Sequence, residues 1–409
     1  MMFVLDYMIS KKIIRAYVLK NALEHKGNVN PGSVVSGLFN HGLKKDKIKD
    51  VMKDIVESIN EIKGLKMEGM EDEFEGLKDL IGHRVEREGI PELENVGKNG
   101  VIMRFSPSPS GALHIGHALT ASLSYLYIKK YGGKFYIRIE DTNPDNIYVP
   151  AYKMIERESK WLFENNVEMV IQSERMELYY RYVDKLLKKG ACYVCECDSD
   201  DFRELIKNKQ ACECRGLDMK EHKRRWRAML NGGYEQGEAV LRFKTPEEFG
   251  GIKHKNVAMR DFPLARINEG RHPLRGKEFR VWPLMNLAVS VDDIEMKMTH
   301  IIRAKDHRDN AERQRMIFEV LGKKFPWVGF LGRIHLKDIE LSSSKIREGV
   351  IAGKYSNWSD KKLFTIASLK KQGYKPEAFW KLAEQIGLKE VDKKIDKKEF
   401  LLLLDGFNR

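Results

Sequence analysis

The sequence lacks long apolar runs. None of its 409 residues belongs to a stretch near the roughly 20 apolar residues that a helix needs to cross a bilayer. The apolar start, Met1 to Ser10, is short, and its basic residues follow it rather than precede it, so we expect no secretion signal. These absences exclude the class of integral membrane proteins, and we expect no membrane partner.

Cysteine is scarce too, with five residues that all lie between positions 192 and 214. Such clustering argues against a disulfide framework and favours a reducing, cytoplasmic setting. Hydrophobic residues make up 42% of the chain, which excludes global disorder, and its length predicts two to four domains. Lys and Arg outnumber Asp and Glu by 73 to 60, which gives a net charge of +13. This excess indicates a polyanion, foremost a nucleic acid, although general solubility charge explains it equally well.

The first part of the chain has the pattern of a helical domain. Ile14, Val18 and Ala22 follow a helical spacing, and a second apolar stripe runs from Ile48 to Ile62. The acidic, glycine-containing segment Met67 to Glu75 is predicted to be a surface turn. We assign no chemistry to this part.

A strand, a stiff turn and the start of a helix are predicted between residues 101 and 117. Two prolines restrict the turn, and His114 and His117 lie three residues apart, on one face of the first helical turn. The free amide groups and positive dipole of a helix start suit an anion such as a nucleotide phosphate. Taken alone, the stretch also fits an ordinary connection with two solvated histidines.

The following sequence predicts a βαβ unit. An apolar helix continues to Tyr131, and residues 134–140 alternate as in a strand, which implies a parallel sheet with a right-handed crossover. Ligands bind beyond the carboxyl ends of such strands. We therefore expect the turn before His114, the segment from Glu140 to Pro144, and Arg303 at the end of a later strand to face one crevice.

The cysteines form two Cys-x-Cys pairs, separated by fourteen residues, with Cys192 as an extra. Four thiolates in two close pairs predict a tetrahedral zinc site at Cys195, Cys197, Cys212 and Cys214. Such a site is structural, since it leaves no open position at the metal. Reduced thiols without metal are the alternative.

Two more segments carry functional residue types. Residues 220–227 are strongly basic around Trp226, which suits nucleic acid or, equally, a solvated helix. With short strands expected at 239–243 and 257–267, they indicate an insertion in the sheet domain. A mobile loop, Leu341 to Lys345, offers a flexible lysine of the kind that contacts a transferring phosphate, although Ser-rich loops with a lysine are common.

Together these motifs resemble the class I aminoacyl-tRNA synthetases and, more narrowly, the archaeal-type glutamyl-tRNA synthetases. The similarity extends from about Lys11 onwards. It is carried by His114-Ile115-Gly116-His117, by Leu341-Ser342-Ser343-Ser344-Lys345, by the segments Arg104 to Gly111 and Arg138 to Thr142, and by the segments Val281 to Asp293 and Thr299 to His307.

The resemblance implies an α/β fold with a Rossmann-like parallel-sheet catalytic domain. The implied ranges are 1–98 for a helical N-terminal domain, 99–190 and 285–340 for the two halves of the catalytic domain, 191–284 for an acceptor-end-binding insertion with the cysteine cluster, and 341–409 for the mobile loop and a helical stem-contact domain. In this family, anticodon-binding β-barrels follow, where this sequence stops at Arg409. We expect a shortened chain, barrels on a separate chain, or no barrels.

The resemblance also implies roles for individual residues. His114, His117 and Lys345 are the implied catalytic residues; the ATP site adds Gly116, Arg333, Ile334 and Ser344; and the glutamate pocket comprises Arg104, Ser106, Ser108, Glu140, Asn286 and Arg303. An arginine can hold a carboxylate with two parallel donors, and a glutamate can hold the ammonium group.

In the implied reaction, the carboxylate of L-glutamate attacks the α-phosphate of ATP, with Mg²⁺, which gives glutamyl-AMP and releases pyrophosphate. The glutamyl group then passes to the 3′ end of tRNA-Glu. The sequence leaves open whether tRNA-Gln is charged as well. Four alternatives remain: a glutaminyl-tRNA synthetase, a tRNA-modifying relative, a small-molecule nucleotidylyltransferase, and a catalytically silent tRNA-binding module.

Overall fold

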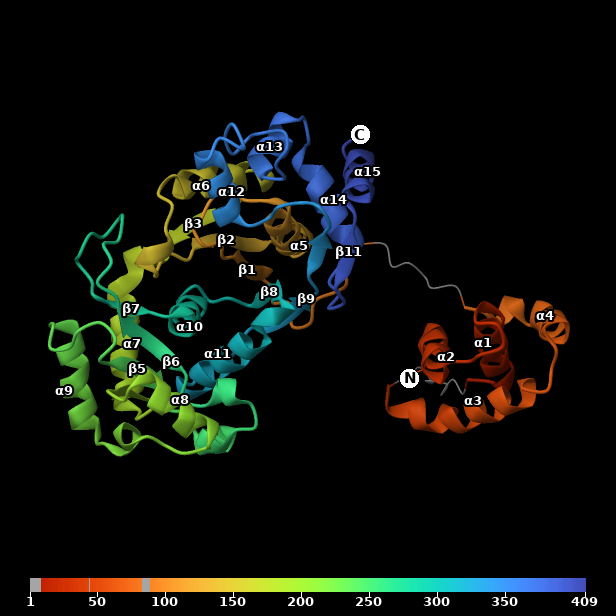
Figure 1. Ribbon diagram of the computed structural model, residues 1–409, viewed down its shortest axis with the longest axis horizontal. Helices are drawn as coiled ribbons and strands as arrows, with labels where there is room; N and C mark the ends of the chain where they lie inside the picture. Colours follow the sequence, from red (N-terminus) through yellow and green to blue (C-terminus); the bar gives the residue numbers. More distant parts are fainter. Residues whose placement is uncertain (1–8, 44, 83–88) are drawn as a thin grey trace. The chain divides into compact units, whose positions relative to one another are not determined.

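The computed structural model describes residues 9–43, 45–82 and 89–409 of the chain (Figure 1). Two compact units follow one another, Met1–Glu88 and Gly89–Arg409. Most of the predicted apolar start, residues 1–8, lies outside the described residues. Within the described ranges, no helix combines the length and the apolar character that crossing a membrane requires.

The first unit is helical, as its apolar spacing predicts. Ile14, Val18 and Ala22 are buried in one core, together with apolar residues of the later helices. The prediction of a surface turn at residues 67–75 is wrong. This segment is a helix because Met70 and Phe74, four residues apart, pack their shared face against that core. The helices are α1 (Lys11–Glu24), α2 (Pro31–Leu38), α3 (Ile48–Ile62) and α4 (Met67–Glu75).

The second unit contains the predicted βαβ arrangement. Strands β1 (Val101–Phe105), β2 (Gly133–Ile139) and β3 (Glu168–Ile171) form a parallel sheet in that order, connected by α5 (Ile115–Tyr131) and α6 (Pro150–Leu162). The α5 helix packs on β1, and its buried residues belong to the core of the sheet. The parallel arrangement places the carboxyl ends of β1 and β2 at one edge.

A second parallel pair lies beside β1. It consists of β8 (His300–Ala304) and β9 (Trp327–Leu331), and the helices near it are α10 (Met285–Glu295) and α11 (Arg308–Val320). Thr299, just before β8, joins the two pairs, because its backbone N–H donates to the Ile102 carbonyl at 3.0 Å and its hydroxyl accepts from the Ile102 N–H at 2.8 Å. The predicted return of the chain to the sheet at residues 298–303 is thus seen.

In the sequence between β3 and β8, the chain forms an antiparallel sheet. Its strands, in spatial order, are β4 (Cys192–Cys195), β5 (Val240–Phe243), β6 (Pro263–Ile267) and β7 (Val281–Pro283); the helices of this region are α7 (Met176–Lys188), α8 (Ser199–Lys207) and α9 (Met219–Leu230). The strand expected at residues 257–267 is shorter, since a 3-10 turn occupies Val257–Met259. The sheet shares a core with residues of α7, α10 and α11.

The last part of the chain is mostly helical and packs on the parallel sheet. Its elements are β10 (Ile334–Leu336), α12 (Ser343–Ile351), α13 (Ile366–Lys371), α14 (Pro376–Ile386), β11 (Lys393–Ile395) and α15 (Lys397–Phe407). Helix α14 lies against α5 (Figure 1), and the Trp380 indole N–H donates to the Leu162 carbonyl at 3.0 Å. The short β10–β11 ladder is parallel; its first strand lies within residues 332–336, where the sequence predicts a strand, whereas β11 was not predicted.

The second unit begins at Gly89, before the boundary expected at residue 98. Leu93 explains the difference, because its side chain is buried in the core of the sheet and its backbone N–H donates to the Tyr131 hydroxyl at 3.1 Å. The division of this unit into catalytic halves, insertion and stem-contact domain stays a prediction.

Candidate active site

Helix α5 begins at the two histidines, and the side chain of each one accepts a hydrogen bond from the backbone of the other. His114 is the N-cap residue, and each Nδ1 accepts the backbone N–H of the other histidine at 3.4 Å. Their rings stack with centroids 3.6 Å apart. Since both Nδ1 atoms accept hydrogen bonds, the neutral rings carry their protons on Nε2, where they can be donated to a ligand.

Burial keeps both imidazoles neutral. It lowers the pKa of His117 to about 4, and it lowers the pKa of His114 well below its ordinary value, with a further contribution from His117. At neutral pH the pair therefore offers uncharged donors beside a helix N-terminus, and the positive potential at this place comes from the helix dipole.

The C-terminal part braces the turn that leads to His114. The Ile115 N–H donates to the Phe364 carbonyl at 3.0 Å, and the Ile366 N–H donates to the Leu113 carbonyl at 2.8 Å. A Cβ atom at Gly111 would collide with the Trp358 ring, so glycine is required where the two segments touch. The turn is thus held by residues about 250 positions further along the chain.

The Ser-rich segment lies against the same turn. A Cβ atom at Gly111 would stand 3.0 Å from Ser343 Cβ, and Leu341 Cδ1 approaches Gly116. The prediction of a loop over residues 341–345 holds only in part, because α12 begins at Ser343. Ser342 caps this helix, and its hydroxyl accepts the Lys345 N–H at 3.5 Å. Ser and Asn are preferred caps, which is why the helix starts here.

Lys345 and Ser344 therefore occupy the first turn of a helix. The Lys345 ammonium is 3.7 Å from a Glu340 carboxylate oxygen, and its side chain is 69% exposed. Such an exposed pair contributes little and is easily exchanged for another anion. The Ser344 hydroxyl is 3.0 Å from that of Ser342.

A buried charge network lies under the carboxyl ends of β1 and β2. Asp293 of α10 accepts from Arg104 Nε at 2.6 Å and Nη2 at 2.9 Å, and from Arg138 Nη1 at 2.6 Å. Burial alone would raise the pKa of Asp293, but the charges of Arg104 and Arg138 lower it to about 2. Arg138 also donates to Glu140 at 3.1 Å, and Arg104 donates to the Ser106 hydroxyl at 3.2 Å.

The opening turn and the end of β2 do meet at one edge of the sheet. The Glu140 N–H donates to the Pro107 carbonyl at 3.0 Å, which ties the two loops together as the βαβ pattern predicts. Arg303, in β8, lies close enough to both loops for their charges to act on it. The charge of Arg104 lowers the pKa of Arg303, and the charge of Glu140 raises it.

Asn286 is connected to Arg303 through Gln314, a residue that the sequence did not identify as part of the site. Gln314 of α11 accepts from Arg303 Nη1 at 3.0 Å and donates to Asn286 Oδ1 at 3.3 Å. His307 was also missed as a site residue. Burial lowers its pKa, and the charge of Arg303 lowers it further. The spacing of His307 and Gln314 relative to Arg303 shows no periodic pattern that could have revealed these two residues.

Three of the expected site residues lie apart from these contacts. The Ser108 side chain is exposed. Arg333 is exposed as well and donates to Asp306 at 2.5 Å, and Ile334 pairs with Lys393 in the β10–β11 ladder. In the part of the chain that the structure describes, no hydrogen bond or ion pair joins these residues to the histidines.

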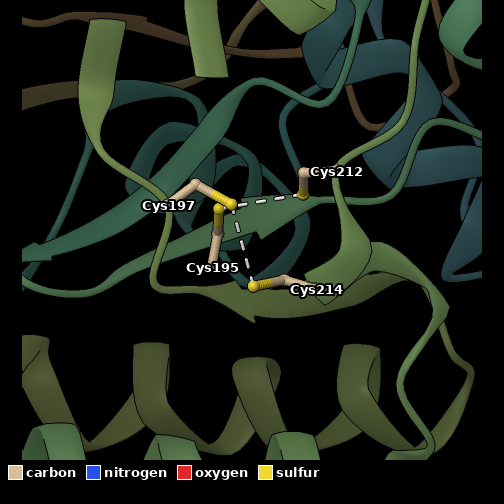
Figure 2. A group of neighbouring side chains, drawn as sticks. All are labelled: Cys195, Cys197, Cys212 and Cys214. Atoms are coloured by element: carbon tan, nitrogen blue, oxygen red, sulfur yellow. Dashed lines mark hydrogen bonds between the residues drawn. The ribbon is translucent and has the colours of Figure 1, made fainter. Parts of the chain in front are cut away.

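The four cysteines expected to bind a metal come together (Figure 2). Their sulfur atoms all lie within 4.8 Å of one another, and the pairs Cys195–Cys212 and Cys197–Cys214 are both 3.9 Å apart. A tetrahedral zinc ion with sulfur ligands at about 2.3 Å needs sulfur atoms about 3.8 Å apart. The geometry of the thiols therefore fits zinc. Cys192 is buried elsewhere, where its thiol faces the Val183 carbonyl at 4.0 Å.

Comparisons with known proteins agree with this geometry. Residues 100–402 match the family of class I tRNA synthetases (E and Q), catalytic domain. The chain is 39% identical over 400 residues to the glutamate–tRNA ligase of Methanothermobacter thermautotrophicus, covering 97% of this chain and 70% of that protein. It is 39% identical over 377 residues to the enzyme of Methanocaldococcus jannaschii, covering 92% and 67%.

A solved structure is similar as well. It is a glutamate–tRNA ligase from Elizabethkingia meningosepticum in complex with its amino acid, with a TM-score of 0.50 and 26% identity over 70% of this chain and 60% of that one. A second structure, from Elizabethkingia anophelis, shares the fold with a TM-score of 0.52. The chain thus belongs to the class I tRNA synthetases for glutamate and glutamine and, within them, to the archaeal-type glutamate–tRNA ligases.

Proposed function

We propose that this chain activates L-glutamate with ATP and transfers the glutamyl group to the 3′ end of tRNA-Glu at the carboxyl ends of β1, β2 and β8. The observation that carries the proposal is the meeting of three distant segments. The histidine turn contacts the Ser-rich helix start at Gly111, and it contacts the end of β2 through Pro107. A phosphate site and an amino-acid site thereby become neighbours, as an adenylation reaction requires.

In this proposal the phosphates of ATP lie at the start of α5. His114 and His117 donate from Nε2, the Gly116 backbone allows close approach, and Lys345 with Ser344 closes over the phosphates from α12. The lysine exchanges Glu340 for the phosphates, whose charge grows in the transition state. Mg²⁺, bound with ATP, would add positive charge at the same oxygens. Arg333 and Ile334 are proposed to hold the adenine.

The amino-acid pocket is proposed to lie above the buried charge network. Glu140 would hold the ammonium group of glutamate, while Arg303 and Asn286 face its carboxylates. Arg104 braces the pocket together with Ser106, because Asp293 occupies two of its donors. Ser108 is assigned to this pocket by resemblance.

Away from this site, we assign a structural zinc ion to Cys195, Cys197, Cys212 and Cys214, because the distances between their sulfur atoms fit a tetrahedral zinc site. The basic helix α9 follows this cluster in the chain and suits the phosphates of the tRNA acceptor end. A separate anticodon-binding chain stays a proposal. None of the five cysteines, all of which lie in the described part of the chain, forms a disulfide, which supports a reducing cytoplasmic setting.

Pyrophosphate exchange tests the activation step. Purified protein with ATP, Mg²⁺ and total tRNA should exchange labelled pyrophosphate when L-glutamate is present, and much less with L-glutamine. H117A and K345A should both lose the exchange. Equal exchange with both amino acids, or exchange that survives H117A, would contradict the proposed site.

A further inference from the structure

Arg303 is held by a neutral side chain, whereas the arginines beside it are held by carboxylates. Arg104 and Arg138 share Asp293, and Arg138 also reaches Glu140. Within the described ranges, Arg303 has no carboxylate within ion-pair distance, and its hydrogen bond goes to the Gln314 amide. In the described part of the chain, the positive charge of Arg303 therefore has no direct ion-pair partner.

The surroundings of Arg303 screen its charge only weakly. Arg303 is 9% exposed, so little water screens it. Burial, and then the charge of Arg104, lower its pKa to about 9, which leaves the guanidinium charged at neutral pH. A buried cation without a partner is costly, and a ligand carboxylate relieves that cost.

The Gln314 amide suits its position because it offers both an acceptor and a donor. Gln314 is 1% exposed, its Oε1 accepts from Arg303 Nη1, and its Nε2 donates to Asn286 Oδ1. A glutamate here would present a second acceptor to Asn286 Oδ1 and would neutralise Arg303. A methionine would keep the volume but hold neither neighbour.

We propose that Gln314 is a specificity-determining positioning residue, which orients Arg303 and Asn286 while leaving the charge of Arg303 free for the acidic side chain of the substrate. This inference rests on the proposed function and deepens it. It assigns the preference for glutamate over glutamine in part to a residue that does not touch the substrate.

The test compares Q314E and Q314M with wild type, and uses Q372E as the matched control. Gln372 is an exposed residue at the end of α13, so Q372E makes the same chemical change away from the pocket. Pyrophosphate exchange gives KM for glutamate, glutamine and ATP in each protein, and circular dichroism checks folding.

We expect Q314E to raise KM for glutamate by about 10- to 100-fold, the loss that corresponds to one hydrogen bond to a charged group. KM for ATP should stay within about two-fold, and the ratio of kcat/KM for glutamate over glutamine should fall. Q314M should raise KM for glutamate while keeping the preference for glutamate, because the charge of Arg303 remains open. Q372E should match wild type.

The inference is overturned if Q314E keeps the wild-type KM for glutamate, or if Q314E weakens glutamate and glutamine equally. Should Q314E not fold, Q314M still decides, since a wild-type KM for glutamate in that variant contradicts the positioning role. Wild-type protein that shows no glutamate-dependent exchange would overturn the proposed function itself, and that outcome is distinct from the others.

Discussion

A buried carboxyl group beneath the histidine turn gives a prediction with a defined magnitude. Glu158 of α6 is 4% exposed, and its Oε2 accepts the N–H of Leu113, the residue before His114, at 2.7 Å. Its Oε1 is buried without a hydrogen-bond partner. Burial raises the pKa of Glu158 to about 7, against the opposing effects of the Leu113 bond and of the charges on Arg157 and Lys370.

The raised pKa makes stability depend on pH in a known direction. Between the ordinary pKa of 4.5 and the folded value of about 7, the folded protein binds a proton at Glu158 that the unfolded chain has released. The contribution is therefore fully present below pH 4.5 and is lost as the pH rises through 7. At 1.36 kcal/mol per pKa unit, linkage gives a loss of about 2.5 kcal/mol between pH 5 and pH 8.

Glu158→Gln removes this titration while keeping an acceptor for Leu113. Urea unfolding followed by tryptophan fluorescence reports on the second unit, because all six tryptophans lie there. From pH 5 to pH 8, the free energy of unfolding of wild type should fall relative to that of the variant by about 2.5 kcal/mol. Ser159→Ala removes a neighbouring buried hydroxyl that has no partner, and it should run parallel to wild type. Parallel curves for Glu158→Gln and wild type would refute the reasoning.

Three further changes probe other parts of the site. Lys345→Ala should lower the rate of glutamyl-AMP formation without changing the unfolding midpoint, since the side chain is exposed; pyrophosphate exchange and urea unfolding measure the two, and a change in glutamate KM alone would contradict the assigned role. Asp293→Asn should cost about 3–5 kcal/mol of stability, because it leaves Arg104 and Arg138 buried without their counter-charge; a loss below 1 kcal/mol in urea unfolding would show that the network relaxes. Cys212→Ser should lower the zinc content measured by elemental analysis, whereas wild type should carry about one equivalent and Cys192→Ser should retain it; wild type purified without chelators and free of zinc would contradict the metal assignment.

Local patterns in the sequence predict the frame of the site well. The strand from Val101, the helix that His114 begins, and the meeting of Glu140 with the opening turn follow from alternation, capping and the βαβ rule. The cysteine spacing likewise predicts that the four thiols meet. Each of these inferences uses residues that are near in sequence or constrained by a common motif.

The sequence did not reveal how distant side chains share charge. Gln314 and Asp293 act through partners that lie elsewhere in the chain, and only those contacts show what the two residues do. The helical start at Ser343 was missed for a related reason, because a Ser-rich stretch fits a loop until Ser342 is seen to cap the helix. Strand β11 was missed because it is three residues long, too short for alternation to show.

The contacts and the comparisons identify this chain as a glutamate–tRNA ligase, for which we propose a single site at the carboxyl ends of β1, β2 and β8. Aminoacylation of purified tRNA-Glu and tRNA-Gln with labelled glutamate and labelled glutamine, in the presence of ATP and Mg²⁺, tests it most directly. We predict that glutamate is esterified to tRNA-Glu and that this requires His117 and Lys345. Charging of glutamine in preference to glutamate, or the absence of any glutamyl-tRNA from folded protein, would contradict the account.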